Sequence, residues 1–311
     1  MERLIAIIGP TAVGKTKISI DLAKLLKTEI ISGDSMLVYR GLNVGTAKPD
    51  LRERAGISHH LIDILEPYEE FSVVEFQQRA RKLISDINDR QLIPILAGGT
   101  GLYVKALIED YQFSHANGNE ELRGKLASIA KERGNPYLHN ILKEVLPEVA
   151  NRLHPNDVRR VIRALEVYYL GGEKISQNKL PETGLLYDAL VLGFNIDRSI
   201  LYERIHTRVD CMISQGLVEE VANLLNRGVP SESQAMQGIG YKEIVEYLAG
   251  QVDLAVAIEN IKKATRNFAK RQLTWYRKMP YIEWIDLGKF DEYDKILEIV
   301  YNYIAEKYGI G

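Results

Sequence analysis

The sequence predicts an α/β fold, a parallel sheet with helices on both faces, into which an all-helical module is inserted. The first hundred or so residues alternate short apolar runs with amphipathic helical patterns. Helical patterns alone then follow as far as Leu170, and a strand pattern returns at Ala189. We therefore predict a core of residues 1–113 and 188–311, interrupted by a helical module of residues 114–187.

Short apolar runs mark the strands expected in the first third. A wholly apolar run is typical of a strand buried on both faces of a parallel sheet. The runs are Leu4–Ile8, Glu29–Ser32, Ile62–Leu65 and Leu92–Leu96. Apolar spacing predicts a helix over Lys15–Lys27, and a capping box at Ser72 opens another toward Arg90. Repeated strand–helix alternation implies right-handed crossovers and therefore parallel strands.

The rest of the chain is expected to be mainly helical, with two more strands. The expected helices are Glu120–Arg133, Pro136–Leu146, Asn156–Leu170, Ile200–Arg227 and Asp253–Met279. Asn156 is the expected N-cap of the third of these helices. Strand patterns occur at Ala189–Phe194 and Tyr281–Asp286. Polar stretches at His115–Gly118 and Gln177–Gly184 are expected to be loops.

Composition excludes several classes of protein. Of the 311 residues, 46% are hydrophobic and 26% charged, which excludes global disorder. Forty Lys and Arg against 42 Asp and Glu give a net charge of -2, so a polyanion would have to meet a local basic patch. The single cysteine, Cys211, excludes a disulfide framework and a multi-thiolate zinc site. No apolar stretch approaches the ~18 residues of a membrane span, so we expect a cytoplasmic protein without a membrane partner.

Residues 9–16 have the G-x-x-x-x-G-K-[ST] pattern of a phosphate-binding loop. Glycines allow backbone N–H groups to converge on phosphate oxygens, and the positive end of the following helix adds to the attraction. Lys15 supplies a charge, and the Thr16 hydroxyl can coordinate Mg²⁺. A glycine-rich turn with a surface lysine is the alternative, but the pattern also follows a strand and opens a helix. The residues predicted to bind a diphosphate are Gly9, Pro10, Thr11, Ala12, Val13, Gly14, Lys15 and Thr16.

Two further strand ends carry polar residues. The carboxyl ends of strands in an open α/β sheet face the ligand crevice. Asp34 follows the second strand and could hold or deprotonate a nucleophile, although an Asp-Ser pair there is also a common turn or helix cap. Thr100 brings a hydroxyl to the same edge. Its strand does not end in the apolar run and Asp of a Walker B site, which disfavours a motor ATPase or a switch GTPase.

Positive charge is concentrated on two predicted helices. Residues 259–279 contain seven basic side chains and one acidic one, and Lys262, Arg266 and Lys270 recur at helical spacing. The helical module adds Arg152, Arg159, Arg160 and Arg163. A solvated helix face is the usual reason for one such cluster. Two clusters in a nearly neutral chain favour contact with a phosphate backbone.

Seven short motifs follow one another along the chain. They are GPTAVGKT (9–16), GDSMLVY (33–39), GLNVGTAKP (41–49), GGTGLY (98–103), RALE (163–166), GYKE (240–243) and AKRQLTWY (269–276). The series spans nearly the whole chain. In these motifs and their order, the sequence closely resembles the bacterial tRNA dimethylallyltransferase (IPP transferase) family. That family prenylates N6 of adenosine 37 beside the tRNA anticodon. The resemblance implies a P-loop kinase-like core with a helical insertion.

The resemblance also implies roles for the matching residues. Residues 11–16 would hold the diphosphate of dimethylallyl diphosphate with Mg²⁺, and Arg208 would add positive charge there. Asp34 would be the general base for adenine N6, and Thr100 would bond the oxygen between the allyl carbon and the diphosphate. The implied tRNA contacts are Ser35, Met36, Leu37, Thr100, Arg123, Arg159, Arg160, Val161, Ile162, Arg163, Gln237, Gly238, Tyr241 and Lys242, with Lys262, Arg266 and Lys270 on the basic helix. Leu37, Asn43 and Arg159 depart from the residues most common in the family.

On this basis the chain is expected to be a monomeric enzyme that uses Mg²⁺, tRNA and dimethylallyl diphosphate. Two other functions remain open from the residues. A P-loop kinase would share the loop and Asp34, but it would not need basic faces on two separate elements. An RNA-binding NTPase without transferase activity would hydrolyse nucleotide when RNA binds and would leave the tRNA mass unchanged.

Overall fold

The computed structural model describes residues 1–113, 119–171 and 184–310. The chain forms two compact units, Met1–Asp110 with Thr183–Gly311 and, between them in sequence, Tyr111–Glu182. The sequence places these borders a few residues away, at 114 and 187. The expected loop at 115–118 and nearly all of that at 177–184 lie outside the described residues. In the described part of the chain, no helix is both long and apolar enough to cross a membrane.

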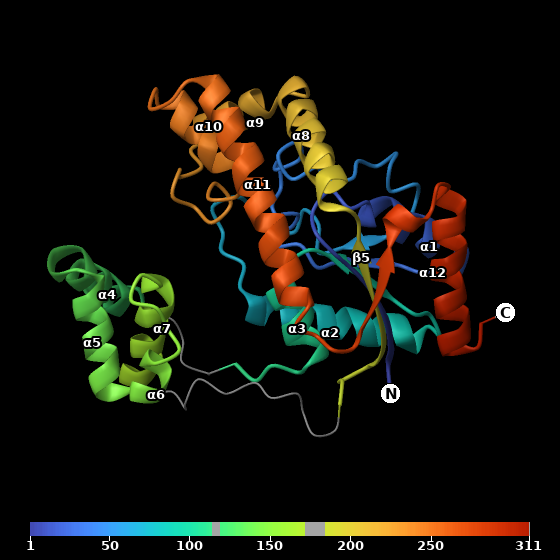
Figure 1. Ribbon diagram of the computed structural model, residues 1–311, viewed down its shortest axis with the longest axis horizontal. Coiled ribbons are helices and arrows are strands. Elements are labelled where there is room, and N and C mark those ends of the chain that lie inside the picture. Colours follow the sequence, from blue (N-terminus) through green and yellow to red (C-terminus); the bar gives the residue numbers. More distant parts are fainter. Residues whose placement is uncertain (114–118, 172–183, 311) are drawn as a thin grey trace. The chain divides into compact units, whose positions relative to one another are not determined.

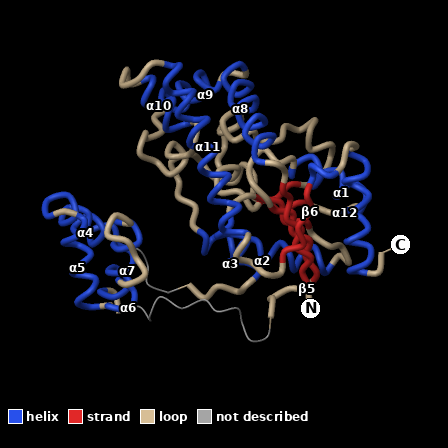
Figure 2. The backbone as a smooth tube through the Cα atoms, in the orientation of Figure 1, coloured by secondary structure: helices blue, strands red, loops and turns tan. Residues whose placement is uncertain are grey.

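A six-stranded parallel sheet is the centre of the larger unit, in the order β3–β2–β4–β1–β5–β6. The strands are β1 (Arg3–Ile8), β2 (Ile30–Ser32), β3 (His59–His60), β4 (Ile95–Gly98), β5 (Asp188–Asn195) and β6 (Ile282–Asp286). Figure 2 shows them gathered among the surrounding helices. The side chains of residues 4–8 are completely buried, because the sheet is covered on both faces.

The helices of the larger unit cover both faces of this sheet or pack on helices that do. They are α1 (Lys15–Leu26), α2 (Val73–Asp89), α3 (Gly101–Ile108), α8 (Arg198–Ser214), α9 (Leu217–Asn226), α10 (Tyr241–Leu248), α11 (Leu254–Tyr276) and α12 (Tyr293–Tyr308), with a short 3₁₀ helix at Leu287–Lys289. One hydrophobic cluster joins the sheet to α2, α3, α9 and α10, and another joins it to α1, α12 and the first half of α8. Figure 1 shows α1 beside α12 and α2 beside α3. The predicted α/β fold with a parallel sheet is confirmed.

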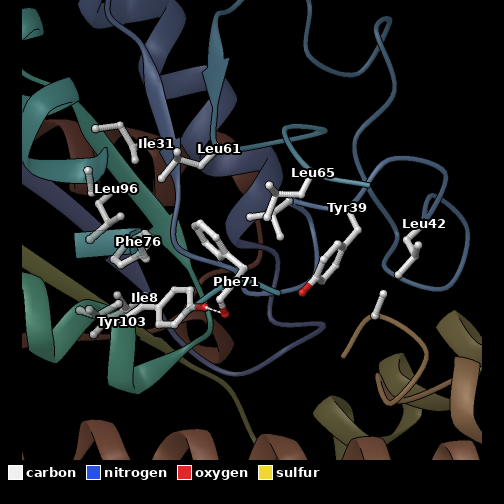
Figure 3. Close-up of a cluster of buried hydrophobic side chains, with 14 of the residues drawn as sticks. Ile8, Ile31, Tyr39, Leu42, Leu61, Leu65, Phe71, Phe76, Leu96 and Tyr103 are labelled. Carbon is white, nitrogen blue, oxygen red and sulfur yellow. Dashed lines mark hydrogen bonds between the residues drawn. The ribbon is translucent and has the colours of Figure 1, made fainter. Parts of the chain in front are cut away.

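An aromatic cluster anchors the start of α3. The rings of Phe76 and Tyr103 stack with their centroids 4.4 Å apart, and Phe71 meets Tyr103 edge-on. The Tyr103 hydroxyl donates to the carbonyl oxygen of Phe71 (Figure 3). Offset aromatic pairs of this kind add to the stabilisation that burial supplies. Because α3 begins one residue after Thr100, the cluster also holds that residue in place.

The expected strand at Ile62–Leu65 is wrong. The chain forms the two-residue strand β3 just before it, and then turns through left-handed backbone conformations at Leu61 (φ 61°) and Asp63 (φ 56°). The buried Lys48 ammonium holds the Asp63 carboxylate at 2.5 Å, which stabilises this turn. Ile62 and Leu65 are buried nonetheless. A short apolar run identifies burial but does not distinguish a strand from a buried loop.

Two helix boundaries and one strand boundary also differ from expectation, and four helices were not expected. The helix predicted over 200–227 breaks between α8 and α9, where Gly216 adopts a φ of 94°. The N-cap of α7 (Val158–Tyr169) is Asp157 rather than Asn156. The expected strand end at Leu96 extends to Gly98. The helices that were not expected are α3, α10 and α12, together with the four-residue helix at Pro147–Ala150.

The smaller unit contains four helices among its described residues. They are α4 (Glu120–Arg133), α5 (Asn135–Val145), α6 (Pro147–Ala150) and α7 (Val158–Tyr169). Leu138, Leu142, Val161 and Leu165 are completely buried in its core. The first two predicted helices of the module agree with α4 and α5 to within one residue at each end.

A buried carboxylate links α4 to α7 in this unit. Glu166 is completely buried, and its oxygens accept from Arg123 Nε at 2.8 Å and Arg163 Nη1 at 2.6 Å. The backbone N–H of Asn119 also donates to it, at 2.8 Å. Burial by itself raises the pKa of Glu166, but the Asn119 N–H and the two guanidinium groups outweigh it and hold that pKa below its usual range. The carboxylate is therefore charged and fully paired.

We expect Glu166→Ala to lower the free energy of unfolding of the smaller unit by about 3 kcal/mol, because it leaves two arginines facing a buried gap. Hydrogen exchange of α4 and α7 peptides in the full chain measures this loss, and Glu120→Ala, which removes an exposed partner of Arg123, is the control. Equal protection of α4 and α7 in Glu166→Ala and Glu120→Ala would contradict this expected loss.

The stabilisation that Glu166 supplies depends on pH. Because the pKa of Glu166 is lowered in the folded protein, this stabilisation is complete above the unfolded pKa and is lost as the pH falls through the folded pKa.

Candidate active site

Three loops meet at the carboxyl edge of the sheet. Since β4 lies between β1 and β2, the loops that follow these three parallel strands are neighbours. Together with α8, α11 and residues 46–49 they line a cavity of about 660 Å³. The cavity lining includes Lys15, Thr16, Asp34 and Arg208, which are distant in sequence. The topology therefore brings these four predicted site residues together.

The phosphate-loop sequence adopts a tight turn around the start of α1. Gly9 has a φ of 149°, and a side chain there would come within 2.7 Å of the Phe194 carbonyl oxygen. Gly14 is the N-cap of α1 with a φ of 108°. The first N–H groups of a helix have no partner within it, so the turn directs unpaired donors and the positive helix end toward the cavity. The Lys15 ammonium, also in the cavity, donates to the Pro10 carbonyl oxygen at 2.7 Å.

The charges in the cavity favour an anion. The pKa of Lys15 is lowered to about 7, mainly by burial and next by the nearby Arg208 guanidinium, while the Asp34 carboxylate opposes the shift. Burial likewise lowers the pKa of Arg208, and Asp34 opposes the shift. Arg208 also donates to the Thr46 carbonyl oxygen at 3.0 Å. Asp34 is the carboxylate that opposes the lowering of the pKa of both cations, and it does not restore either pKa to its usual value, so a multiply charged anion would stabilise their charged forms.

Asp34 lies in a turn that backbone contacts hold against the β4–α3 loop. The Gly33 N–H donates to Ala97 O at 2.8 Å, and the Thr100 N–H donates back to Gly33 O at 3.2 Å. A Cβ at Gly98 would lie 2.4 Å from the Gly33 backbone, so only glycine permits this approach. Asp34 Oδ1 accepts from the Met36 N–H at 2.8 Å. Asp34 therefore does stabilise a turn, as one of the two interpretations of the sequence proposed. The hydrogen bond to Met36 uses one of its oxygens, and the carboxylate still lines the cavity.

Thr100 and Ser35 form a small hydroxyl pair beside Asp34. The Thr100 Oγ1 accepts from the Ser35 N–H at 3.2 Å and lies 3.5 Å from the Ser35 hydroxyl. Both side chains are partly exposed. The Thr100 hydroxyl is thus held against Ser35, the residue that follows Asp34, although Thr100 itself does not line the cavity.

Two segments assigned to tRNA contact lie together in the larger unit. A Cβ at Gly238 would come within 2.4 Å of the Met36 side chain, so the two segments meet at Met36 and Gly238. Leu37 lines the cavity, and Gln237 and Lys242 are exposed. The remaining side chain of this group, Tyr241, is completely buried, and its hydroxyl donates to Glu220 at 2.6 Å. Its side chain supports this surface from within.

The basic face of α11 is less uniform than its spacing suggests. The side chain of Lys262 is only 14% exposed and its ammonium lies 2.8 Å from Asp210. Arg266 is partly buried and bonds the His206 ring. Lys270 is exposed, as are its neighbours Lys263 and Arg271. Lys262, Arg266 and Lys270 were predicted to form one basic stripe. Of these three, only Lys270 is exposed to solvent.

Within the smaller unit, the predicted tRNA-contacting arginines also differ in their partners. Arg159 and Arg160 are exposed, and Arg160 lies 3.3 Å from Asp157. Arg123 and Arg163 are partly committed to Glu166, Val161 is buried in the core and Ile162 is partly buried.

Two buried or half-buried polar residues were missed by sequence reasoning. Glu220 on α9 accepts from the N–H groups of Asn43, Val44 and Gly45 and so shapes the loop that carries the Arg208 partner Thr46. Gln272 on α11 bonds both the phosphate loop and the β4–α3 loop. A signal for Gln272 was available, since it is a polar residue on the inward face of α11, where Ala269 and Tyr276 are buried.

This sequence matches the IPP transferase family over residues 37–279. The chain belongs to the IPP transferase family. It is 50% identical over 307 residues to a tRNA dimethylallyltransferase of Geobacillus thermodenitrificans, with 98% of this chain and 97% of the relative covered. A tRNA dimethylallyltransferase of Carboxydothermus hydrogenoformans is 51% identical over 303 residues, with 96% of each chain covered.

Solved structures of family members have the same fold. A full-length tRNA isopentenylpyrophosphate transferase from Bacillus halodurans aligns with a TM-score of 0.75 and 44% identity, covering 99% of this chain and 97% of that one. A eukaryotic dimethylallyltransferase acting on tRNA aligns with a TM-score of 0.83 and 31% identity, covering 98% of this chain and 80% of that one. The predicted family, the P-loop kinase-like fold and the prenyltransferase class of enzyme are confirmed.

We expect the affinity for inorganic pyrophosphate to fall as the pH rises above about 7, because Lys15, whose pKa is near 7, must be charged to attract it. The fall approaches tenfold per pH unit where only the charged form binds. Isothermal calorimetry between about pH 6 and pH 8 measures both this change and the accompanying proton uptake. Lys15→Arg keeps its charge throughout, so its residual pH dependence reports the ligand's own ionisation. An identical dependence in both proteins would refute the role of Lys15 titration.

Proposed function

We propose that the chain transfers the dimethylallyl group of dimethylallyl diphosphate to N6 of adenosine 37 in the tRNA anticodon loop, releasing diphosphate and forming N6-isopentenyladenosine. One observation carries the proposal: five phosphate-loop residues, Arg208 and Asp34 line a single cavity, the five being Thr11, Ala12, Gly14, Lys15 and Thr16. The tRNA dimethylallyltransferases that share about half of its residues support the reaction class.

Binding of the donor would rest on the cationic end of the cavity. An allylic diphosphate ionises more readily when the charge developing on its leaving group is stabilised. Lys15, Arg208 and the N–H groups at the start of α1 would supply that stabilisation, because they already lie at the cavity wall. The Thr100 hydroxyl, held beside Ser35, would donate to the oxygen that bridges the allyl carbon and the diphosphate.

The same residues suit a magnesium ion that binds together with a diphosphate. Magnesium prefers hard oxygen ligands and is usually held by one or two protein groups, substrate phosphates and water. The Thr16 hydroxyl lies at the cavity wall beside the phosphate-loop backbone. Across the described ranges, no cluster of three or more His, Cys, Asp or Glu could hold a metal alone, which agrees with a ligand-dependent site. When bound, Mg²⁺ would neutralise diphosphate charge.

Asp34 would act on the acceptor. The N6 amine of adenine is a weak nucleophile because its lone pair is delocalised into the ring, so it needs orientation and removal of its proton. One Asp34 oxygen is held by the Met36 N–H, which leaves the other to accept from N6 as the C–N bond forms. Because the base is stacked in its loop, it would have to be extruded to reach this carboxylate.

Recognition of tRNA would use phosphate contacts from exposed basic side chains. Lys270, Lys263 and Arg271 are exposed on α11, and Arg159 and Arg160 are exposed on α7 of the smaller unit. The surface formed by Met36, Leu37 and Gln237 would lie closest to the extruded base, because it borders the cavity that holds Asp34. A monomeric state and a cytoplasmic location remain predictions.

The direct test incubates the protein with unmodified tRNA and dimethylallyl diphosphate, and in parallel with radiolabelled ATP and candidate acceptors. We expect nuclease-digested tRNA to contain isopentenyladenosine at position 37 by mass spectrometry, with no phosphate transfer from ATP. Phosphate transfer without prenyl transfer would identify a kinase instead.

Replacing Asp34 by Asn should reduce kcat by about 10²–10⁴-fold, since the amide keeps the shape but cannot accept the N6 proton. The Kd for tRNA should change little, because a general base acts mainly in the transition state. Single-turnover rates and filter binding measure the two effects. Glu53→Gln is the matched control, an exposed carboxylate that lines the same cavity, and it should retain nearly full activity. A weakened Kd with a normal single-turnover rate would remove Asp34 from the chemistry.

The variant Lys270→Ala should weaken binding to all tRNAs alike and reduce the slope of log affinity against log salt by about one unit, as loss of one phosphate contact does. Filter binding over a salt series measures the slope. Lys295→Ala, which removes an exposed lysine from α12, should leave it unchanged. Equal slopes for wild type and Lys270→Ala would assign Lys270 to an ordinary solvated face.

A further inference from the structure

Gln272 connects two of the three loops at the cavity. Its side chain is 4% exposed and projects from α11 between the phosphate loop and the β4–α3 loop. Its Oε1 accepts from the Thr11 N–H at 2.8 Å, and its Nε2 donates to the Gly99 carbonyl oxygen at 2.8 Å. Both ends of one amide are therefore used, one in each loop.

This bridge replaces strand pairing where the sheet ends. Strands β1 and β4 are paired up to Ile8 and Gly98, and beyond that point the phosphate loop turns away toward α1. The loops after β2 and β4 remain joined by backbone bonds between Gly33, Ala97 and Thr100. Between the loops after β1 and β4, the Gln272 amide supplies the corresponding connection.

Few side chains could make this bridge. It needs a donor and an acceptor on one planar group at the end of a side chain long enough to leave α11, which glutamine provides. A glutamate would place a carboxylate oxygen against the Gly99 carbonyl, with no proton between them and a negative charge beside the phosphate loop. Gly99 is required in turn, since a Cβ there would lie 2.4 Å from Gln272 Nε2.

We propose that Gln272 is a positioning residue, which holds the phosphate loop in register with the β4–α3 loop so that the bound diphosphate and the Thr100 hydroxyl keep a fixed separation. The inference rests on the proposed function, in which these two loops contact the same donor molecule. A loop shifted by about 1 Å from a reactive arrangement can cost on the order of 10²-fold in rate.

The test compares Gln272→Met with Gln77→Met in the full-length protein. Gln77 is also a buried helical glutamine whose amide donates to a backbone carbonyl, that of Ala106, but it does not contact the cavity. We expect Gln272→Met to raise the Kd for inorganic pyrophosphate about tenfold and to lower kcat about 10–100-fold, with the Kd for tRNA unchanged. Calorimetry, single-turnover rates and filter binding provide these values, and thermal unfolding checks that both variants are equally folded.

Gly99→Ala approaches the same bridge from the other side and should reproduce the loss of pyrophosphate affinity. The double variant Gly99→Ala/Gln272→Met should lose little more than the worse single variant, because both changes break one connection. A purely structural role of Gln272 would lower the number of pyrophosphate-binding sites, while the folded molecules kept the wild-type Kd. That outcome would overturn the proposal, and so would equal effects of Gln272→Met and Gln77→Met.

The same experiments separate this proposal from the proposed function. If the wild-type protein binds pyrophosphate but does not prenylate tRNA, the proposed function fails, while the pyrophosphate comparison still decides the role of Gln272.

Discussion

The close approach of the Gly33 and Gly98 backbones is the contact on which the rest of the site depends. It is possible because β4 lies directly between β1 and β2 and because Gly98 carries no side chain. The approach sets the separation between the Asp34 turn and Thr100, and the bonds of Gly33 with Ala97 and Thr100 make it rigid. A Cβ at Gly98 would lie 2.4 Å from the Gly33 backbone, so it would separate the two loops and move the carboxylate away from the cavity.

Around this contact, the larger unit uses buried polar groups to shape loops that strand pairing does not reach. Gln272 joins the phosphate loop to the β4–α3 loop, and Glu220 gathers three consecutive N–H groups of the 43–45 segment. Each of these groups is satisfied by several hydrogen bonds, which offsets the desolvation that burial imposes. The cavity is therefore a set of irregular loops held by specific side chains on helices α9 and α11.

The cations of the cavity are arranged for a ligand rather than for stability. Burial lowers the pKa of both Lys15 and Arg208, which means that their charged forms are destabilised in the folded protein. Glu166 in the smaller unit shows the contrary case, since its two arginines and the Asn119 N–H overcome burial and lower its pKa. A group that is left under-compensated at a cavity wall gains most when an ion of opposite charge binds.

By itself, the sequence determined the α/β class, most strands, the three longer helices of the smaller unit and the residues of the phosphate loop, because these depend on local periodicity, capping and glycine patterns. Tertiary structure alone decided that 62–65 is a buried turn, that Lys262 and Arg266 have internal partners, and that Glu220 and Gln272 hold the loops of the site. The physical reason is that a charge or amide pattern along a helix specifies which side chains share a face. Which of them finds a partner depends on residues tens to hundreds of positions away that only the folded chain brings near.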